Sequence, residues 1–494
     1  MLSDSAPIAA LSAPQSVGDA LDILRELLSQ GAQLEHLLAL NYLYAAFSLK
    51  KYSGEFSQSP TPEQTERIEA QLERNRRWEA QILFVARQEM EHLCMVQNML
   101  AILDEPPYMW RPNFPIAPDR YPIGPALTLS RFSRTTIETF RYFEKPLDVH
   151  LPLPPTPAEL TGLPPGDTAS LYNSVEKLYQ DIRMLFDYLL QHRYVQGRNP
   201  NRVVNEHFGF NIELDPLVIG KYESYLDQII SLIIDQGEGA GSVPPTLGSH
   251  FMTFQQILAD LTTCEQAGMP GDPALPVVEN PVLQTQFHTI GSNGQPTGYL
   301  VTNSFTRKAV QLFNEAYTLQ NRMLTGFFAL YNVDNTTGVH PPRVNAYFQT
   351  AFYPFMTMII RPLSETLCRL PADASYQPQP GKLPERTAGP SFELLVPQGK
   401  NGDAEQRATF APFDDLAQYE AAFESLRKQA EWLAQNVPPG YAPLGGRSHR
   451  ENFVLLEQNL WRIRQNFARY WTGEIVAPIP SKDFTNFDGP QPFN

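Results

Sequence analysis

The chain has 494 residues, 42% of them hydrophobic, and a formal net charge of -15. This excess of acid argues against a nucleic-acid partner and against attraction to an anionic membrane, since both favour clustered Lys and Arg. The three cysteines, Cys94, Cys264 and Cys368, are far apart and lie among apolar neighbours, which indicates buried thiols in a reducing compartment. No apolar run reaches membrane-spanning length and the first residues lack a secretory pattern, so we expect a cytoplasmic protein.

The first long helical pattern carries a buried charge. Ser16 or Asp19 can cap a first helix with a buried stripe of leucines, which leads into it. The run from Gln33 to Lys50 is apolar on nearly every side, interrupted chiefly by Glu35-His36 and by Asn41. A carboxylate in such a helix enters the core with the rest of the segment, so it needs a partner there.

The second long pattern runs from about Glu63 to Leu103 and predicts one continuous helix. Its first half is highly charged, whereas its second half, ILFVARQEMEHLCMVQNMLAIL, is mostly apolar. Glu89 and His92 lie in the apolar half. Because they are three residues apart, they project from the same helix face and can reach one metal ion.

Three further segments complete the first half of the chain. Helices are predicted over residues 129–143 and 169–192, separated by a proline-rich crossover. A third helical pattern begins near residue 217, is lost at Gly237 and the glycines that follow it, and resumes at Ser249. This pattern predicts a helix that is broken by a loop.

The second half of the chain is less regular at first and then helical again. The 45 prolines cluster in connecting segments, which favours long ordered loops over a helical frame. We therefore predict an all-α protein with a four-helix bundle in residues 1–270 and an additional, mainly helical region in residues 271–494 packed on it. Helical spacing in that region covers residues 305–331, 343–370, 414–436 and 451–471.

Six polar residues that lie within or beside the apolar helical stretches are candidate metal ligands. Four carboxylates and two imidazoles suit two divalent ions of iron, or of manganese, because bridging carboxylates neutralise most of the charge. The candidates are Glu35, Glu89, His92, Glu176, Glu238 and His250.

Several alternatives to this set remain open. Glu35 and Glu89 could instead pair with buried arginines such as Arg87 or Arg131, and His92 could be a core histidine bonded to a carbonyl group. Spacing does not choose among the acids of one helix. The other candidates are Asp181 and Asp187 in place of Glu176, Asp235 in place of Glu238, and Glu138 or Glu144 on a helix whose position the sequence does not fix.

Four segments of the first half carry a family resemblance. They read QLEHLLALNYLYAAFSLKK, RQEMEHLCMVQNMLAIL, DQIISLIIDQGEG and SHFMTFQQIL, and they resemble the ferritin-like family that includes a domain of the imine-dimer synthases of violacein and rebeccamycin biosynthesis. The resemblance covers about residues 20–265. A later match, MIIRPLSETLCRLP followed by AGPSFE, is similar to the C-terminal part of stand-alone members.

The resemblance implies a ferritin-like bundle and carries the family's ligands onto five of the candidates. The helix-A Glu falls on Glu35, the Glu-x-x-His on Glu89 and His92, and the last two motifs on Glu238 and His250. The helix predicted over residues 169–192 departs from the family pattern. Lys177 stands where the family's Glu would align, and a shift of one residue turns Glu176 by about 100° around the helix.

The preferred hypothesis is a non-haem di-iron oxidoreductase that acts with dioxygen on a small, amino-acid-derived or other metabolite in specialised biosynthesis. The resemblance favours a second reading, the coupling of amino-acid-derived imines. A third is a non-catalytic helical scaffold whose carboxylates are paired with arginines. Phosphate-loop and serine-nucleophile motifs are absent from the sequence, and a homodimer is compatible with all three readings.

Overall fold

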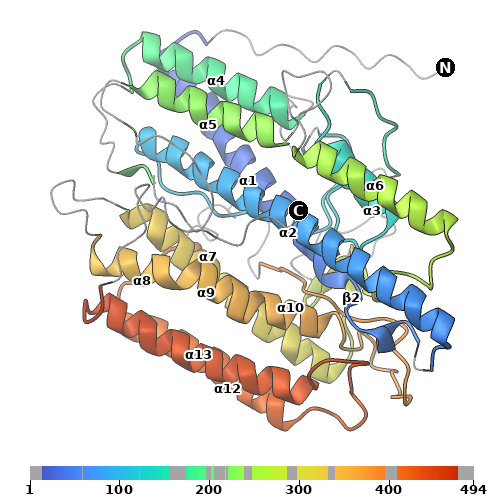
Figure 1. Ribbon diagram of the computed structural model, residues 1–494. Coiled ribbons are helices and arrows are strands. Elements are labelled where there is room, and N and C mark those ends of the chain that lie inside the picture. Colours follow the sequence, from blue (N-terminus) through green and yellow to red (C-terminus); the bar gives the residue numbers. More distant parts are fainter. Residues whose placement is uncertain are drawn as a thin grey trace.

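Helices stack in layers across the molecule (Figure 1). The computed structural model places α4 and α5 along one side, α1 and α2 beside them, then α7 to α10, with α12 and α13 on the opposite side. The expected all-α class is confirmed. The structure describes residues 14–57, 59–118, 120–121, 123–147, 149–155, 174–195, 202–204, 217, 221–237, 248–285, 297–331, 340–394 and 409–476.

The two longest helices pack against each other and form the centre of the bundle. Helix α1 spans Val17–Ser48 without a break, and the Ser16 side chain accepts a hydrogen bond from the Asp19 amide at its start. Helix α2 spans Pro62–Ile102. Its N-terminus has a capping box in which Thr61 and Gln64 each satisfy the other's backbone N–H. Helix α2 lies close to its predicted bounds, whereas α1 joins the first predicted helix and the run from Gln33 in one element.

The layer opposite α1 and α2 consists of four shorter helices. Helix α4 packs on α1 and α5, while α3 packs on α6. Two long helices of a regular four-helix bundle are thus each replaced by two pieces. The interruption between α5 and α6 was predicted from the glycines after residue 236. The bounds are α3 Arg134–Phe143, α4 Val175–Gln191, α5 Tyr222–Gly237 and α6 His250–Gln266.

The second half of the chain is mainly helical. A two-stranded parallel pair, β1 Pro281–Val282 and β2 Tyr299–Leu300, lies in the stretch that the sequence leaves irregular. The predicted helix over residues 343–370 is broken into four pieces, one of which is a π-helix. The bounds are α7 Ser304–Leu330, α8 Pro342–Ala351, α9 Tyr353–Phe355, η5 Met356–Ile360, α10 Arg361–Leu367, α12 Leu416–Gln435 and α13 His449–Trp471.

Buried ion pairs and a shared core join the two halves. Glu55, in the short 3-10 helix η1 (Ser53–Glu55) that follows α1, accepts a hydrogen bond from Arg369 at 2.7 Å, and both side chains are almost fully buried. Lys51 reaches Glu79 and Glu365, each at 2.7 Å. Most of the buried apolar side chains belong to one cluster that extends from Ala20 in α1 to Phe467 in α13.

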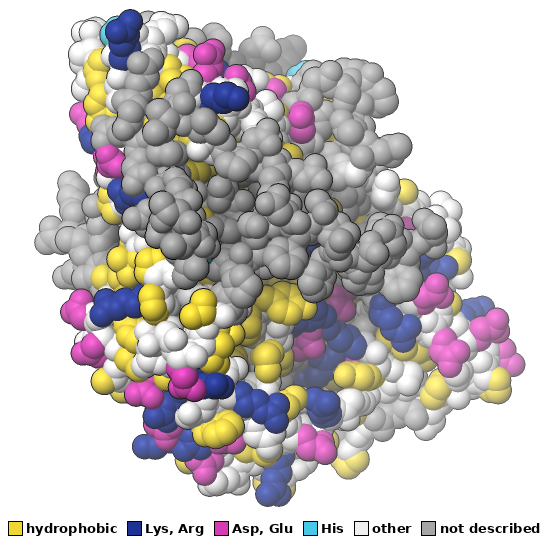
Figure 2. All heavy atoms as spheres, turned by 60° about the vertical axis from the view of Figure 1, so that its left-hand side comes forward, with side chains coloured by type: hydrophobic (Ala, Val, Ile, Leu, Met, Phe, Trp, Pro, Cys, Tyr) yellow, Lys and Arg dark blue, Asp and Glu magenta, His cyan; other side chains and the backbone are white. Residues whose placement is uncertain are grey.

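The surface carries charges of both signs. Figure 2 shows acidic and basic side chains intermixed over the described part of one face, without a field of one sign. Within the described ranges, no helix combines the length and the apolar character that crossing a bilayer requires.

Candidate metal centre

Two groups of buried acids and histidines share one residue, Glu89, at the centre of the bundle. The first joins Glu35 of α1 to Glu89 and His92 of α2. The second joins Glu89 to Glu144, at the end of α3, and His250, the first residue of α6. Four helices therefore converge on the site, although two of them only begin or end there.

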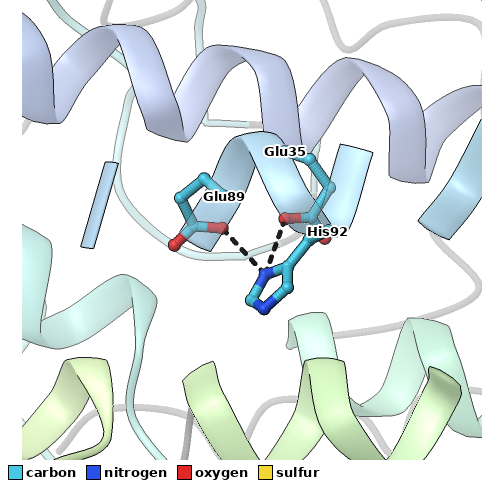
Figure 3. A group of neighbouring side chains, drawn as sticks. All are labelled: Glu35, Glu89 and His92. Carbon is cyan, nitrogen blue, oxygen red and sulfur yellow. Dashed lines mark hydrogen bonds and ion pairs between the residues drawn. The ribbon is translucent and has the colours of Figure 1, made fainter. Parts of the chain in front are cut away.

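In the first group, two carboxylates face one imidazole nitrogen (Figure 3). The Nδ1 atom of His92 lies 3.3 Å from Glu35 Oε2 and 3.2 Å from Glu89 Oε2. The exposed fraction of each of these side chains is only 2%. Because water is excluded, the negative charge strongly favours a cation at this point.

The second group repeats this arrangement around the other imidazole. The Nδ1 atom of His250 lies 2.9 Å from Glu89 Oε1 and 3.5 Å from Glu144 Oε2. The two imidazole rings are stacked, with centroids 5.6 Å apart. Glu89 therefore points one carboxylate oxygen at each histidine, which is the placement of a carboxylate that bridges two ions.

Glutamine side chains orient both histidines. The Nε2 atom of His92 lies 2.9 Å from Gln236 Oε1, and that of His250 lies 3.1 Å from Gln88 Oε1. Since an amide oxygen can only accept, each Nε2 carries the proton. This tautomer leaves the Nδ1 lone pair of each imidazole free for a metal, as in many metal sites where the outer nitrogen donates to a neighbouring group.

Tyrosine hydroxyls hold the outer oxygens of two carboxylates. Tyr179 of α4 donates to Glu35 Oε1, and Tyr42 of α1 donates to Glu144 Oε1. Glu144 also lies close to the end of α5, where a Cβ atom added to Gly237 would come within 3.3 Å of Glu144 Oε2. The small residue thus allows the interrupted helix to approach the site.

Unsatisfied buried atoms test whether a metal fits here. Glu89 Oε1 and His250 Nδ1 are 2.9 Å apart, but their orientation does not make a hydrogen bond, and neither atom has another hydrogen-bond partner among the described residues. Buried polar atoms seldom lack a partner. A cation that both atoms coordinate would satisfy them, so the donor set fits a metal ion.

The electrostatics agree with this fit. Burial raises the pKa of Glu35 to about 7, although His92 opposes the shift. Burial alone would lower the pKa of His250, but the charge of Glu89 outweighs it and raises that pKa to about 9. The acids therefore favour a cation at the Nδ1 atoms, either a proton or a metal ion.

The structure brings together four of the six predicted ligands: Glu35, Glu89, His92 and His250. Glu238 lies outside the described residues, and its alternative Asp235 is exposed. Glu176 is not part of either group. It lies in the first turn of α4, where its carboxylate accepts from the side chain of Gln180 and from the backbone of Leu147.

The alternatives on the same helices are also accounted for. Asp181 pairs with Lys177, and Asp187 pairs with Arg183. The residue of α4 that reaches the site is Tyr179. Among the arginines weighed as partners, Arg131 pairs with Asp272 at 2.5 Å rather than with the buried acids of α1 or α2.

Glu144, which the sequence left without a position, lies in the second group of acids and histidines, whereas Glu176 does not. Sequence spacing contained a signal for it: Glu144 follows Phe140 by four residues and Ile137 by seven, so it continues the buried stripe of α3. Its position opposite α6 depends on tertiary packing, which the spacing does not give.

Comparisons with known proteins support the family resemblance. The ferritin-like family model matches residues 28–259, a range that includes both groups of candidate ligands. Dichlorochromopyrrolate synthase of Lentzea aerocolonigenes is 26% identical over 430 residues, which are 80% of this chain and 38% of that protein. The 2-imino-3-(indol-3-yl)propanoate dimerase of Chromobacterium violaceum is 26% identical over 435 residues, 84% of this chain and 37% of that protein.

The chain spans less than two fifths of the length of these curated relatives. A solved ferritin-like protein from Caulobacter vibrioides, 17% identical, covers 63% of this chain and 87% of its own, with a TM-score of 0.36. Residues 28–259 are therefore a ferritin-like domain, and the resemblance of the chain to the imine-dimer synthases is confirmed.

Proposed function

We propose that the ferritin-like domain holds two metal ions, with iron expected and manganese as the alternative, and that the protein is an oxidoreductase acting with dioxygen on a small metabolite. One ion would be held by Glu35, Glu89 and His92, and the other by Glu89, Glu144 and His250. The observation that carries the proposal is the position of Glu89, which faces the Nδ1 atoms of both histidines.

The donor set selects the class of metal. Carboxylate oxygens and imidazole nitrogens, without thiolate, suit divalent iron and manganese. Bound iron would supply redox chemistry with dioxygen. The chain contributes a site from which water is excluded, carboxylates fixed by Tyr42 and Tyr179, and histidines oriented by glutamine side chains.

Metal analysis of the purified protein tests the proposal. After anaerobic incubation with ferrous iron and removal of the excess, we expect about two ions per chain, measured by inductively coupled plasma mass spectrometry. Glu89→Ala should lose most of both ions because it faces both histidines, and His92→Ala should lose one. Normal metal content in both variants would contradict the assignment.

A matched control separates loss of a ligand from general damage. Asp235→Ala removes an exposed acid near the end of α5 and should leave the metal content unchanged. Far-ultraviolet circular dichroism of each variant checks that the helices are retained. If the wild type binds no iron and consumes no dioxygen with any substrate supplied, the scaffold interpretation replaces this one.

A second candidate function is the coupling of imines derived from aromatic amino acids. It is favoured by the two curated relatives, one of which is named as a dimerase of an indolyl imino acid. The similarity extends over 80% and 84% of this chain, so it includes residues beyond the ferritin-like domain. Under this hypothesis, the metal ions could have a structural role and take no part in an oxidation.

Product analysis distinguishes the two candidates. An amino-acid oxidase would generate imines from tryptophan and phenylalanine in the presence of the protein, and mass spectrometry would search for the dimer. A dimer that forms equally with wild type and Glu89→Ala would favour coupling without a catalytic metal. Absence of a dimer from both imines would count against coupling.

A further inference from the structure

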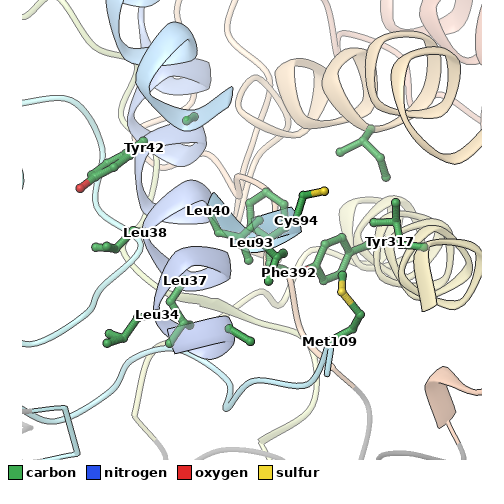
Figure 4. Packing of buried hydrophobic residues seen from close by; sticks show 14 of the residues in the cluster. Leu34, Leu37, Leu38, Leu40, Tyr42, Leu93, Cys94, Met109, Tyr317 and Phe392 are labelled. Carbon is green, nitrogen blue, oxygen red and sulfur yellow. The ribbon is translucent and has the colours of Figure 1, made fainter. Parts of the chain in front are cut away.

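A cavity of about 280 Å³ lies on the side of α1 and α2 that faces α7 and the π-helix η5. Its size is close to the lower end of the range for small-molecule sites, which is about 300–1,000 Å³. Most of its lining is apolar. Figure 4 shows six of its lining residues gathered between α1 and α7: Leu40, Leu93, Cys94, Met109, Tyr317 and Phe392.

The cavity is separate from the candidate metal centre. On α2, Glu91 lines the cavity and follows Glu89 by two residues, so its side chain projects about 200° further around the helix. On α1, His36 lines the cavity and adjoins Glu35, which places it about 100° away. The same two helices therefore present the metal ligands to one side and the cavity wall to another.

The deep polar groups of the cavity include several hydrogen-bond acceptors, of which Glu91 is the one that carries a negative charge. The side-chain amide nitrogens of Gln320 and Asn321 each donate one of their two hydrogens to a backbone carbonyl, of Ala351 and Tyr317 respectively, so each side chain keeps its oxygen as an acceptor and one N–H. Glu91 is 3% exposed, and its Oε1 atom makes no hydrogen bond with the described residues. The nearest cation to that atom is Arg87, whose Nε lies 3.8 Å away.

The Arg111 and Tyr317 donors near this wall are already engaged. Arg111 is fully buried and donates through Nε and a terminal nitrogen to the Tyr317 hydroxyl, at 3.3 and 3.2 Å. Because a guanidinium cannot accept, the Tyr317 proton points to His36 Nε2, 2.6 Å away. The remaining His36 proton is on Nδ1, which makes no hydrogen bond of normal geometry with the described residues, although the ring interacts with the backbone of Met109.

The cationic side chains that line the cavity lie at its solvent side. The exposed fractions are 36% for the Arg87 side chain and 42% for Arg361. Arg361 donates to Glu79 and Glu365, each at 2.8 Å, so its charge is compensated. The Glu91 oxygen that makes no hydrogen bond therefore favours a ligand that supplies a hydrogen-bond donor in the buried part of the cavity.

The wall opposite α1 has an irregular backbone. The π-helix η5 is inserted between α9 and α10, and its residues Met356, Thr357 and Ile360 line the cavity beside Tyr353, which is 71% exposed. Such insertions are uncommon and occur often at functional sites. A π-turn at this wall is a second feature that points to a ligand, besides the Glu91 oxygen that makes no hydrogen bond.

We propose that this cavity is a binding site for an aromatic amine, distinct from the metal centre. The ring would lie among the apolar side chains of α1, α7 and η5, and the nitrogen would donate to Glu91 with Gln320 or Asn321 as further acceptors. The proposal does not depend on bound metal or on the oxidoreductase function.

Calorimetric titration with 2-phenylethylamine tests the proposal. The comparison ligand is 3-phenylpropanoate, which has the same ring but carries an acid in place of the amine. We expect the amine to bind at least tenfold more tightly than the acid, both in iron-loaded and in metal-free protein. Equal or tighter binding of the acid would overturn the proposal and point to the arginines at the solvent side.

Three variants locate the site. Glu91→Gln removes the charge but keeps the shape, and it should weaken amine binding at least tenfold while the iron content stays at the wild-type value. Ala39→Leu should weaken both ligands because the added atoms enter the cavity that Ala39 lines. Glu315→Gln, on α7 but bonded to Gln311 and Gln429, should bind as the wild type does.

The outcomes separate this proposal from the proposed function. Amine affinity that is unchanged in Glu91→Gln overturns the cavity assignment whatever the iron content. Loss of amine binding in Glu91→Gln with normal iron content supports it. A protein that binds the amine but no iron would keep this inference and contradict only the di-metal function.

Discussion

Glu89 lies between two histidines, with Oε2 at 3.2 Å from His92 Nδ1 and Oε1 at 2.9 Å from His250 Nδ1. Glu89 and His92 lie on adjacent turns of α2, and His250 is the first residue of α6. The two groups that share Glu89 differ in their second carboxylate, which is Glu35 beside His92 and Glu144 beside His250.

The first prediction concerns which acid completes the second group. Glu144→Ala should reduce the iron content from about two ions to about one, since it removes a carboxylate only from the side of His250. Glu176→Ala should retain both ions because Glu176 lies outside the two groups. Metal analysis of both variants after identical loading measures the difference.

The reverse result would restore the sequence-based candidate. If Glu176→Ala lost an ion and Glu144→Ala kept both, α4 would contribute a metal ligand, as the family pattern implies. Circular dichroism of both proteins is needed for this comparison, because Glu144 also accepts a hydrogen bond from Tyr42.

The sequence predicted the parts of the site that depend on one helix at a time. Glu89 and His92 follow from a three-residue spacing, and Glu35 from a charge within an apolar helix. The break before His250 follows from glycines. These are local signals, and the helices that carry them are found close to the predicted bounds.

The contribution of Glu144 could not be predicted in the same way. A helix of ten residues such as α3 has no spacing that fixes its neighbour, and its packing on α6 is a long-range contact. The family pattern directed attention to Glu176 and Lys177 on α4, which faces the site through Tyr179 instead. The proposed boundary near residue 270 likewise stays a prediction, because one apolar core continues through both halves.

The second prediction concerns the tyrosines that hold the carboxylates. Tyr179→Phe removes the hydroxyl that donates to Glu35, and Tyr42→Phe removes the one that donates to Glu144. Loss of such outer contacts typically weakens metal binding about 10–100-fold. Competition with a chelator of known affinity should therefore show weaker iron binding in each variant, with the ring packing retained.

A tyrosine outside the site provides the control. Tyr225 is buried in the same bundle, and its hydroxyl accepts a hydrogen bond from the Asn98 side-chain amide, so Tyr225→Phe changes stability without touching the two groups. Chelator competition that is equally weakened in Tyr225→Phe would show that the effect is not specific to the carboxylates.

The third prediction concerns the ion pair between Glu55 and Arg369, which links the segment after α1 to the end of α10. The Glu55 carboxylate also accepts from the backbone amides of Lys51 and Tyr52. Arg369→Met leaves this carboxylate buried without its cation, which should reduce the free energy of unfolding by about 3–5 kcal/mol. Chemical denaturation measures the change.

The double variant Glu55→Gln with Arg369→Met is the matched control. It removes both charges and keeps a polar group for the two amides, so it should be less destabilised than Arg369→Met alone. A double variant that loses the sum of the two single effects would mean that the pair does not interact.

The fourth prediction concerns the pH dependence of stability through His449, the first residue of α13. Burial and the nearby charge of Arg369 lower the pKa of His449 to about 4. An unfolded histidine has a pKa of about 6.5. Between these values the unfolded chain binds a proton that the folded chain does not, so the free energy of unfolding falls as the pH is lowered from 6.5 to 4.

The expected size of this effect is about 3 kcal/mol over the whole interval, and it is constant above pH 6.5 because both states are then neutral. His449→Gln should remove that part of the slope, while His192→Gln, at an exposed position at the end of α4, should keep it. Subtracting the variant from the wild type cancels the other groups that titrate in this range. Parallel curves of wild type and His449→Gln from pH 4 to 7 would mean that His449 accepts its proton as readily in the folded protein as in the unfolded chain.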